Sequence, residues 1–216
     1  MTAINTNVGA LMSRANAKIA DGRMQTHMRR LSSGLRVNSA SDDAAGLAVA
    51  NKLKSQLRGI DMGIRNSADA IGMLQTADAG LSTSVNITLR MKELAIQMAN
   101  DIYTTTDRAN ALVEFAQLGA QISAISENTL FNEAELIDGT ISTLSIRIGN
   151  DAAEVLAITI DDADIYTTTI TIATAASAAT SATTLATAIN TLSNSQADVG
   201  AYINRLQFNV DNLTNA

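Results

Sequence analysis

Few residues of this sequence have side chains that could carry out chemistry. His27 is the only histidine and no cysteine is present, so no Ser-His-Asp triad, multi-histidine metal site or thiolate nucleophile can be assembled. His27 lies between Thr26 and Met28 in a helical pattern, which indicates a place on a helix surface. The sequence therefore predicts a protein that is not an enzyme and has no catalytic residue.

Two groups of carboxylates would be the candidates for a Mg²⁺ or Ca²⁺ site. Asp42 and Asp43 form one group, and Asp161, Asp162 and Asp164 form the other. The glycine and the bidentate glutamate of an EF-hand loop are absent at the required spacing. Helix capping and solvated turns are the favoured roles, so neither a metal nor another cofactor is expected.

The composition indicates which kind of secondary structure positions these side chains. The chain has 216 residues and 46% of them are hydrophobic, which is enough for a packed core. It has three Tyr, three Phe and no Trp, so aliphatic side chains and Met must fill that core. No Pro is present to interrupt a helix. Long, closely packed helices are therefore expected.

Charge is distributed unevenly along the sequence. Residues 1–58 hold nine Lys and Arg against three Asp, a net charge of about +6, which leaves about −12 for the remainder. The basic segment lacks aromatic residues for stacking on bases, and its cations are scattered, so a solvated helix face is favoured over binding to nucleic acid or to a membrane. Apolar runs are short, and neither a membrane span nor a cleaved signal peptide is predicted.

Apolar residues at helical spacing predict three segments in the first 127 residues. An amphipathic helix extends from Ile4 to about Leu31. A polar connector follows, in which Ser41 or Asp42 can cap a long helix over about 44–100. At 1.5 Å per residue this helix would be roughly 85 Å long. A further helix is expected over about 107–127.

The pattern then changes to alternation, and at the end of the chain it becomes a heptad pattern. Alternating apolar residues around the turn at Gly149–Asp151 predict a β-hairpin region over about 136–173. A low-complexity tract of Thr, Ala and Ser occupies 161–184, where a loop is expected. A helix over about 183–214 follows, with spacings of four and three that are typical of coiled coils. Its apolar packing seam consists of Leu185, Ile189, Leu192, Val199, Ile203, Leu206, Val210 and Leu213.

Together these patterns predict a mainly α fold. We expect a long antiparallel helical rod, like a coiled-coil bundle, with a small β-hairpin region and an amphipathic N-terminal arm. The expected domains are the arm and connector at 1–43 and the rod at 44–216.

Several sequence segments closely resemble the bacterial flagellin family. The segments that carry the resemblance are Ile4–Asn7, Leu31–Ala48, Met91–Ala95, Phe131-Asn132, Ile137–Gly139 and Ala197–Ala201. The resemblance extends over nearly the whole chain and is most specific in the first 100 residues.

This resemblance implies a structural subunit that self-assembles with other flagellin subunits into a homopolymer, the extracellular filament used for swimming. It also implies secretion by the flagellar export apparatus, with a chaperone and without a cleaved signal peptide. Recognition by Toll-like receptor 5 is implied as well. Its receptor-binding positions fall on Arg90, Glu93, Leu94 and Glu114, although an ion pair or subunit contact explains Arg90 and Glu114 equally well, and Leu94 is equally suited to the core.

The sequence departs from the family pattern in two places. Only the tract at 161–184 stands where flagellins usually carry large variable outer domains, and the chain ends at Ala216, where the family continues into a C-terminal core helix. The expectation is a short member, or a shortened form, that lacks both. Two alternatives remain open: a hook–filament junction adaptor, and a basic amphipathic binder of membranes or nucleic acid.

Overall fold

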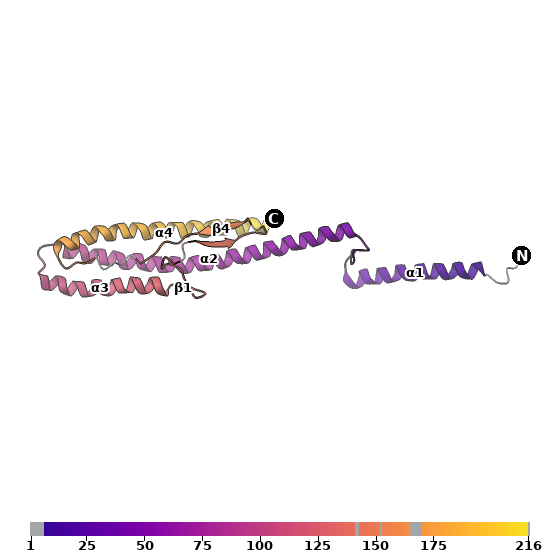
Figure 1. Ribbon diagram of the computed structural model, residues 1–216, viewed down its shortest axis with the longest axis horizontal. Helices are drawn as coiled ribbons and strands as arrows, with labels where there is room; N and C mark the ends of the chain where they lie inside the picture. Colours follow the sequence, from indigo (N-terminus) through magenta and orange to yellow (C-terminus); the bar gives the residue numbers. More distant parts are fainter. Residues whose placement is uncertain (1–6, 141–142, 152, 165–169, 216) are drawn as a thin grey trace. The chain divides into compact units, whose positions relative to one another are not determined.

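A computed structural model describes residues 7–140, 143–151, 153–164 and 170–215. These residues form four helices and two small antiparallel sheets (Figure 1). The mainly α fold with a small β-hairpin region is thereby confirmed. The chain divides into two compact units, Met1–Arg58 and Gly59–Ala216, which we call unit 1 and unit 2 and describe separately.

Unit 1 contains α1 (Val8–Ser33) and the first turns of α2 (Ala44–Met98). Asn7 caps α1, because its side-chain oxygen accepts a hydrogen bond from the Ala10 N–H at 3.1 Å. The helix ends at Gly34, whose φ of 66° suits a residue without a Cβ. None of the residues of α1 is buried. Of the N-terminal motif, residues 4–6 lie outside the described residues.

Asp42 and Asp43 organise the connector between α1 and α2. The hydrogen bond from the Ser39 hydroxyl, followed by bonds from backbone N–H groups, lowers the pKa of the Asp42 carboxyl. Asp43, rather than Ser41 or Asp42, caps α2 by accepting from the Gly46 N–H at 2.9 Å. The Asp42 carboxylate already accepts hydrogen bonds from Ser39 in the connector, so Asp43 caps the helix instead.

The contact-based division falls inside α2, after Arg58, whereas the sequence places the boundary after residue 43. The first turns of α2 carry the apolar residues Val49, Leu53 and Leu57, which are all more than half exposed. This part of the helix therefore has no packing partner among the described residues of unit 1. The division into an arm at 1–43 and a rod at 44–216 stays a prediction.

Unit 2 is built from the rest of α2, α3 (Thr105–Asn128) and α4 (Ala175–Asn215). Figure 1 shows α3 and α4 beside α2, both running back along it, so the bundle is antiparallel. A capping box starts α3: Thr104 accepts from the Asp107 N–H, and Asp107 accepts from the Thr104 N–H at 2.9 Å. This box explains why the helix begins at Thr105.

Two apolar clusters form the core of unit 2. The first joins α2, the strands and α4, with Leu74, Leu156 and Leu206 as fully buried members. The second lies nearer the α2–α3 turn and includes Met91 and Phe115. Among the described residues, Phe115 is the one aromatic side chain that is fully buried. Apart from Phe115, the buried apolar residues of the core are aliphatic or Met, as the composition indicates.

The packing seam of α4 has two columns, and they differ in burial. One column consists of Leu185, Leu192, Val199 and Leu206, each no more than 1% exposed. The other predicted column, Ile189, Ile203, Val210 and Leu213, is only half-buried. Ala188 and Ser195, one residue earlier than two heptad positions, are buried instead. Small side chains allow close approach of the backbones at the centre of the contact, and the isoleucines lie at its margin.

Two hairpins connect α3 to α4. The first pairs β1 (Leu130–Phe131) with β2 (Ala134–Glu135), and sequence analysis missed it because each strand has only two residues. The second pairs β3 (Leu144–Arg147) with β4 (Val155–Ile158), within the predicted hairpin region, and places Leu144 opposite Ile158. Burial alternates along β4, so Leu156 and Ile158 face the core. Of the predicted hairpin region, residues 141–142, 152 and 165–169 lie outside the described residues.

The fourth helix begins at Ala175, earlier than the sequence pattern indicates. Thr174 and Ser177 exchange hydrogen bonds, since the Ser177 N–H donates to Thr174 Oγ1 at 3.1 Å and the Thr174 N–H donates to Ser177 Oγ at 2.9 Å. The alanines that follow have high helix propensity. Part of the tract that was expected to be a loop is therefore helical. Along it, Thr hydroxyls such as that of Thr180 donate to the carbonyl four residues earlier.

The buried column of α4 leads to a prediction about stability. Replacement Leu206→Ala should lower the free energy of unfolding of unit 2 by about 2–5 kcal/mol, because it leaves a cavity in the core. The matched control is Phe208→Ala on the same helix, where the side chain is 75% exposed. That variant should stay within about 0.5 kcal/mol of the parent. Urea unfolding followed by circular dichroism measures both, and equal effects would contradict the described packing.

Candidate functional site

An exposed ion-pair cluster joins α2 to α3. Arg90 of α2 lies opposite Glu114 of α3, with its Nη2 2.9 Å and its Nε 3.0 Å from Glu114 Oε1. Its third contact is to Glu93, one turn further along α2, whose Oε2 is 3.2 Å from Arg90 Nη1. Three of the four residues assigned to receptor binding by resemblance are therefore brought together.

This cluster is open to solvent. The side chains of Arg90, Glu93 and Glu114 are 51%, 69% and 48% exposed. The hydrogen bond from Arg90 to Glu114, followed by the one to Glu93, raises the pKa of the arginine. Exposed ion pairs contribute little to stability because water and salt screen them. A planar guanidinium held between two carboxylates is, however, a defined polar surface for a protein partner.

Leu94, the fourth residue of that set, lies elsewhere. It is 4% exposed and belongs to the second core cluster with Met91 and Phe115. Its side chain therefore packs in the core and offers no surface to a partner. Leu89, the neighbour of Arg90, is 43% exposed and contributes apolar area beside the ion pairs.

A buried arginine holds the turn between α2 and α3, and sequence analysis missed it. Arg108 is 8% exposed and donates from Nε to the Met98 carbonyl at 3.0 Å and from Nη2 to the Asn100 carbonyl at 2.9 Å. The last carbonyls of a helix lack intrahelical partners, so this cation caps the C-terminal end of α2. We call Ala99–Thr104 the tip turn. The sequence signal for this cap is the position of Arg108 in the first turn of α3. The helix dipole disfavours a cation there, so a basic residue at that position needs another partner.

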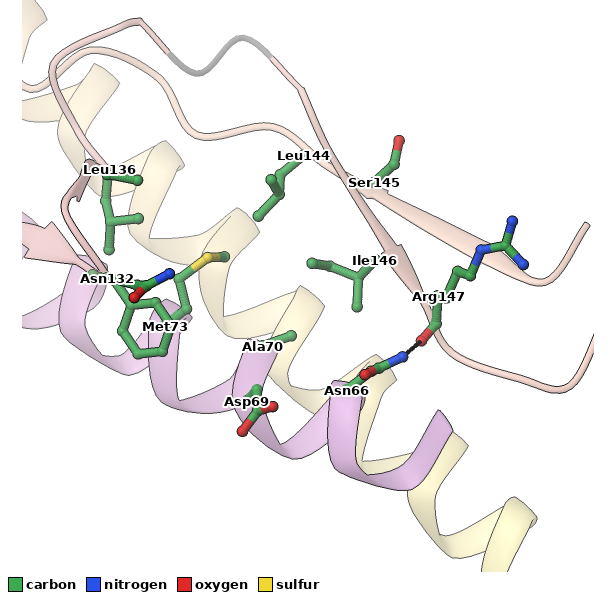
Figure 2. A pocket seen from close by; sticks show the side chains of 12 residues that line it. Asn66, Asp69, Ala70, Met73, Asn132, Leu136, Leu144, Ser145, Ile146 and Arg147 are labelled. Atoms are coloured by element: carbon green, nitrogen blue, oxygen red, sulfur yellow. Dashed lines mark hydrogen bonds between the residues drawn. The ribbon is translucent and has the colours of Figure 1, made fainter. Parts of the chain in front are cut away.

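A groove of about 590 Å³ lies on α2 between the turn of the first hairpin and β3 (Figure 2). Figure 2 shows Leu144 and Ile146 facing the helix across from Ala70 and Met73. Asn66 anchors the far end, because its Nδ2 donates to the Arg147 carbonyl at 3.1 Å. The apolar floor consists of Ala70, Met73, Leu136, Leu144 and Ile146.

The hairpin turn that forms one wall of this groove has an unusual backbone. Asn132 and Glu133 have φ of 51° and 66°, the left-handed region that side chains other than glycine rarely adopt. A two-residue hairpin turn with positive φ at both positions explains this conformation. The turn keeps Phe131 and Asn132 at the groove wall, with Phe131 36% exposed. The sequence match at Phe131-Asn132 thus falls on this turn.

The carboxylate groups named from the sequence are separate from these surfaces. No group of three or more possible ligands is close enough to hold a metal ion within the part of the chain that the structure describes. Asp161 accepts from Ser195 Oγ at 3.2 Å, and Asp162 accepts from the Asp164 N–H at 2.7 Å. These contacts are those of turns and helix packing. None of the described helices is long and apolar enough to cross a membrane.

Comparison with known proteins identifies the family of this chain. Residues 4–142 match the family model for the bacterial flagellin N-terminal helical region. The chain belongs to the bacterial flagellin family. It is therefore a structural protein rather than an enzyme, and the family identifies it as a subunit of the flagellar filament, which is an extracellular homopolymer. The sequence predictions of family and of a non-enzymatic protein are thus confirmed.

The relatives differ in how much of their length this chain spans. The flagellin of Halalkalibacterium halodurans is 37% identical over 220 residues, which cover 99% of this chain and 80% of that protein. Flagellin D of Vibrio cholerae is 40% identical over 159 residues, which cover 74% of this chain and 42% of that protein. The chain thus spans most of the first flagellin and less than half of the second.

Solved structures support the same fold. The crystal structure of Bacillus cereus flagellin has a TM-score of 0.64 and 32% identity, covering 69% of this chain and 88% of that one. A flagellar hook-associated protein structure from Vibrio parahaemolyticus has a TM-score of 0.69 at 14% identity, over 82% of this chain and 95% of that chain. At this identity the second likeness shows a shared fold and nothing more.

The two arginines described above should differ in their effect on stability. Arg108→Ala should lower the free energy of unfolding by about 1–3 kcal/mol, because it leaves the Met98 and Asn100 carbonyls without their buried donor. Arg90→Ala removes only exposed ion pairs and should change stability by less than about 1 kcal/mol. Thermal unfolding of the two variants in parallel measures the difference, and a larger loss for Arg90→Ala would overturn the assignment.

Proposed function

We propose that this flagellin chain polymerises with copies of itself into the filament that a bacterium rotates to swim. The carrying observation is the match to a flagellin over 99% of this chain. The exposed apolar residues of α1 support the proposal, since a helix with no buried residue gains by packing against other subunits. Export through the flagellar secretion apparatus, with a chaperone and without a cleaved signal, belongs to the same proposal.

A junction adaptor between hook and filament is the second candidate. The likeness to the Vibrio parahaemolyticus structure brings it into consideration, but only as a shared fold. The curated relatives described above are flagellins, at 37–40% identity. We therefore favour the filament subunit, and the two functions differ in an outcome that can be observed directly.

Seeded growth separates the two functions. Purified chain added to sheared filament seeds should lengthen them in proportion to its concentration, because each added subunit recreates the binding end. An adaptor would add once and stop growth. Electron microscopy of seed lengths measures this, and production of the chain in a bacterium without its own flagellin should restore swimming. Seeds that keep their length would contradict the filament proposal.

We further propose that Toll-like receptor 5 recognises the ion-pair cluster of Arg90, Glu93 and Glu114. The family resemblance supports this, and so do the exposure and proximity of the three side chains. Leu94 is left out of the proposed surface because it is buried. Arginine held in a defined geometry is common among residues that dominate protein interfaces.

Receptor-bearing reporter cells test this surface. Arg90→Ala and Glu114→Ala should each raise the concentration needed for half-maximal signalling by about tenfold or more, the change that a loss of about 1.4 kcal/mol produces. Glu127→Ala is the matched control, because Glu127 is an exposed glutamate on α3, the helix that carries Glu114. Equal signalling by all three variants would show that the receptor does not use the cluster.

A further inference from the structure

Methionine thioethers are the side chains of this protein that a peroxide attacks first. The chain has eight Met but neither Cys nor Trp, so no thiol or indole competes with them for the oxidant. A two-electron oxidant adds one oxygen atom to the sulfur and forms methionine sulfoxide, which methionine sulfoxide reductases convert back. The position of each Met in the structure therefore decides what oxidation does to the protein.

Four described methionines are open to solvent, and three of them belong to α1. Met12, Met24 and Met28 are 68%, 59% and 62% exposed, although α1 has only 26 residues. Met62 of α2 is the fourth and is 51% exposed. A small neutral oxidant such as hydrogen peroxide reaches these sulfur atoms without any opening of the fold.

The other described methionines are core residues of unit 2. Met91 is fully buried and Met98 is 3% exposed in the second cluster, although Met98 directly precedes the tip turn. Met73 is 5% exposed in the first cluster. A peroxide attacks such side chains when the core opens, and the free energy of that opening slows the reaction. The fold thereby protects the methionines of this core and leaves those of α1 unprotected.

The methionines of α1 belong to the exposed apolar residues of that helix. Met24 and Met28 are four residues apart, so they lie on one face of α1 together with Leu31. Met12 shares a face with Val8, four residues earlier. Oxidation makes these side chains polar, and a sulfoxide oxygen is costly to bury without a hydrogen-bond donor. Because α1 has no buried residue, sulfoxides on it disrupt no packing within the described chain.

We propose that Met12, Met24 and Met28 are an oxidative modification site, and that their sulfoxidation by a peroxide blocks addition of the free subunit to a filament while unit 2 stays folded. The inference rests on the proposed filament function, in which the exposed apolar residues of α1 pack against other subunits. Each thioether gains one oxygen atom from hydrogen peroxide, so the sulfur is oxidised and the peroxide is reduced to water. Reductases restore the thioether, which makes the block reversible.

Peroxide treatment of the full chain tests the site itself. Mass spectrometry of peptides after brief exposure to hydrogen peroxide should show Met12, Met24 and Met28 oxidised about tenfold faster than Met91 and Met98, or more. Circular dichroism should show that the thermal unfolding of unit 2 is unchanged. Equal oxidation rates for the two groups would overturn the site, and a lowered melting temperature of unit 2 would overturn the selective effect on α1.

Seeded growth tests the consequence of the modification. The oxidised chain should lengthen filament seeds several-fold more slowly than untreated chain, and methionine sulfoxide reductases A and B together should restore the rate, since each reduces one sulfoxide epimer. Oxidised chain that lengthens seeds at the untreated rate overturns the proposed block. Untreated chain that does not lengthen seeds refutes the filament function, and with it the block, but not the selective oxidation of α1, which is measured without seeds.

Leucine variants assign the effect to α1, because leucine is close to methionine in volume and helix propensity and has no sulfur. The full chain with Met12→Leu, Met24→Leu and Met28→Leu should lengthen seeds equally well before and after peroxide treatment. The matched control is Met62→Leu, which removes an exposed sulfur of α2 and should lose growth on oxidation as the parent chain does. Equal loss of growth by the triple variant, or protection by Met62→Leu alone, would contradict the assignment.

Discussion

The apolar contact between α2 and α4 is the interaction on which unit 2 depends. Each helix has one narrow apolar stripe, and an isolated helix of this kind gains too little from its own backbone bonds to be stable in water. Leu74 on α2 and Leu192 and Leu206 on α4 are fully buried in one cluster. The hairpin of β3 and β4 covers the same cluster through Leu156 and Ile158, so strands and helices share one core.

Much of this architecture could be predicted from the sequence because its signals are repetitive. The long apolar stripe of α2 and the column of Leu185, Leu192, Val199 and Leu206 define helices whatever their surroundings. Alternation predicted the hairpin of β3 and β4. The second predicted column of α4 is only half-buried, because the side chain at the centre of a contact depends on how closely the partner approaches. There Ala188 and Ser195 are buried, and Ile189 lies at the margin.

Surface features followed from the sequence less well. Family resemblance pointed to Arg90, Glu93 and Glu114, and they meet, but Leu94 proved to be a core residue because it is on the inner face of the same helix. The Arg108 cap and the positive φ of Asn132 and Glu133 depend on contacts and turns of only a few residues. Such features carry no periodic signal. A groove made by three separate elements has no linear signature at all.

The long sequence separation between α2 and α4 has a kinetic consequence. Gln196 donates to Asp78 across 118 residues, whereas α2 and α3 are joined by a short turn. Closing the longer loop costs more chain entropy, and nearby segments meet first. The α2–α3 hairpin can thus form early, while the shared core is completed only when α4 arrives. Because the chain has neither proline nor cysteine, that last step waits for no slow peptide-bond isomerisation or disulfide exchange.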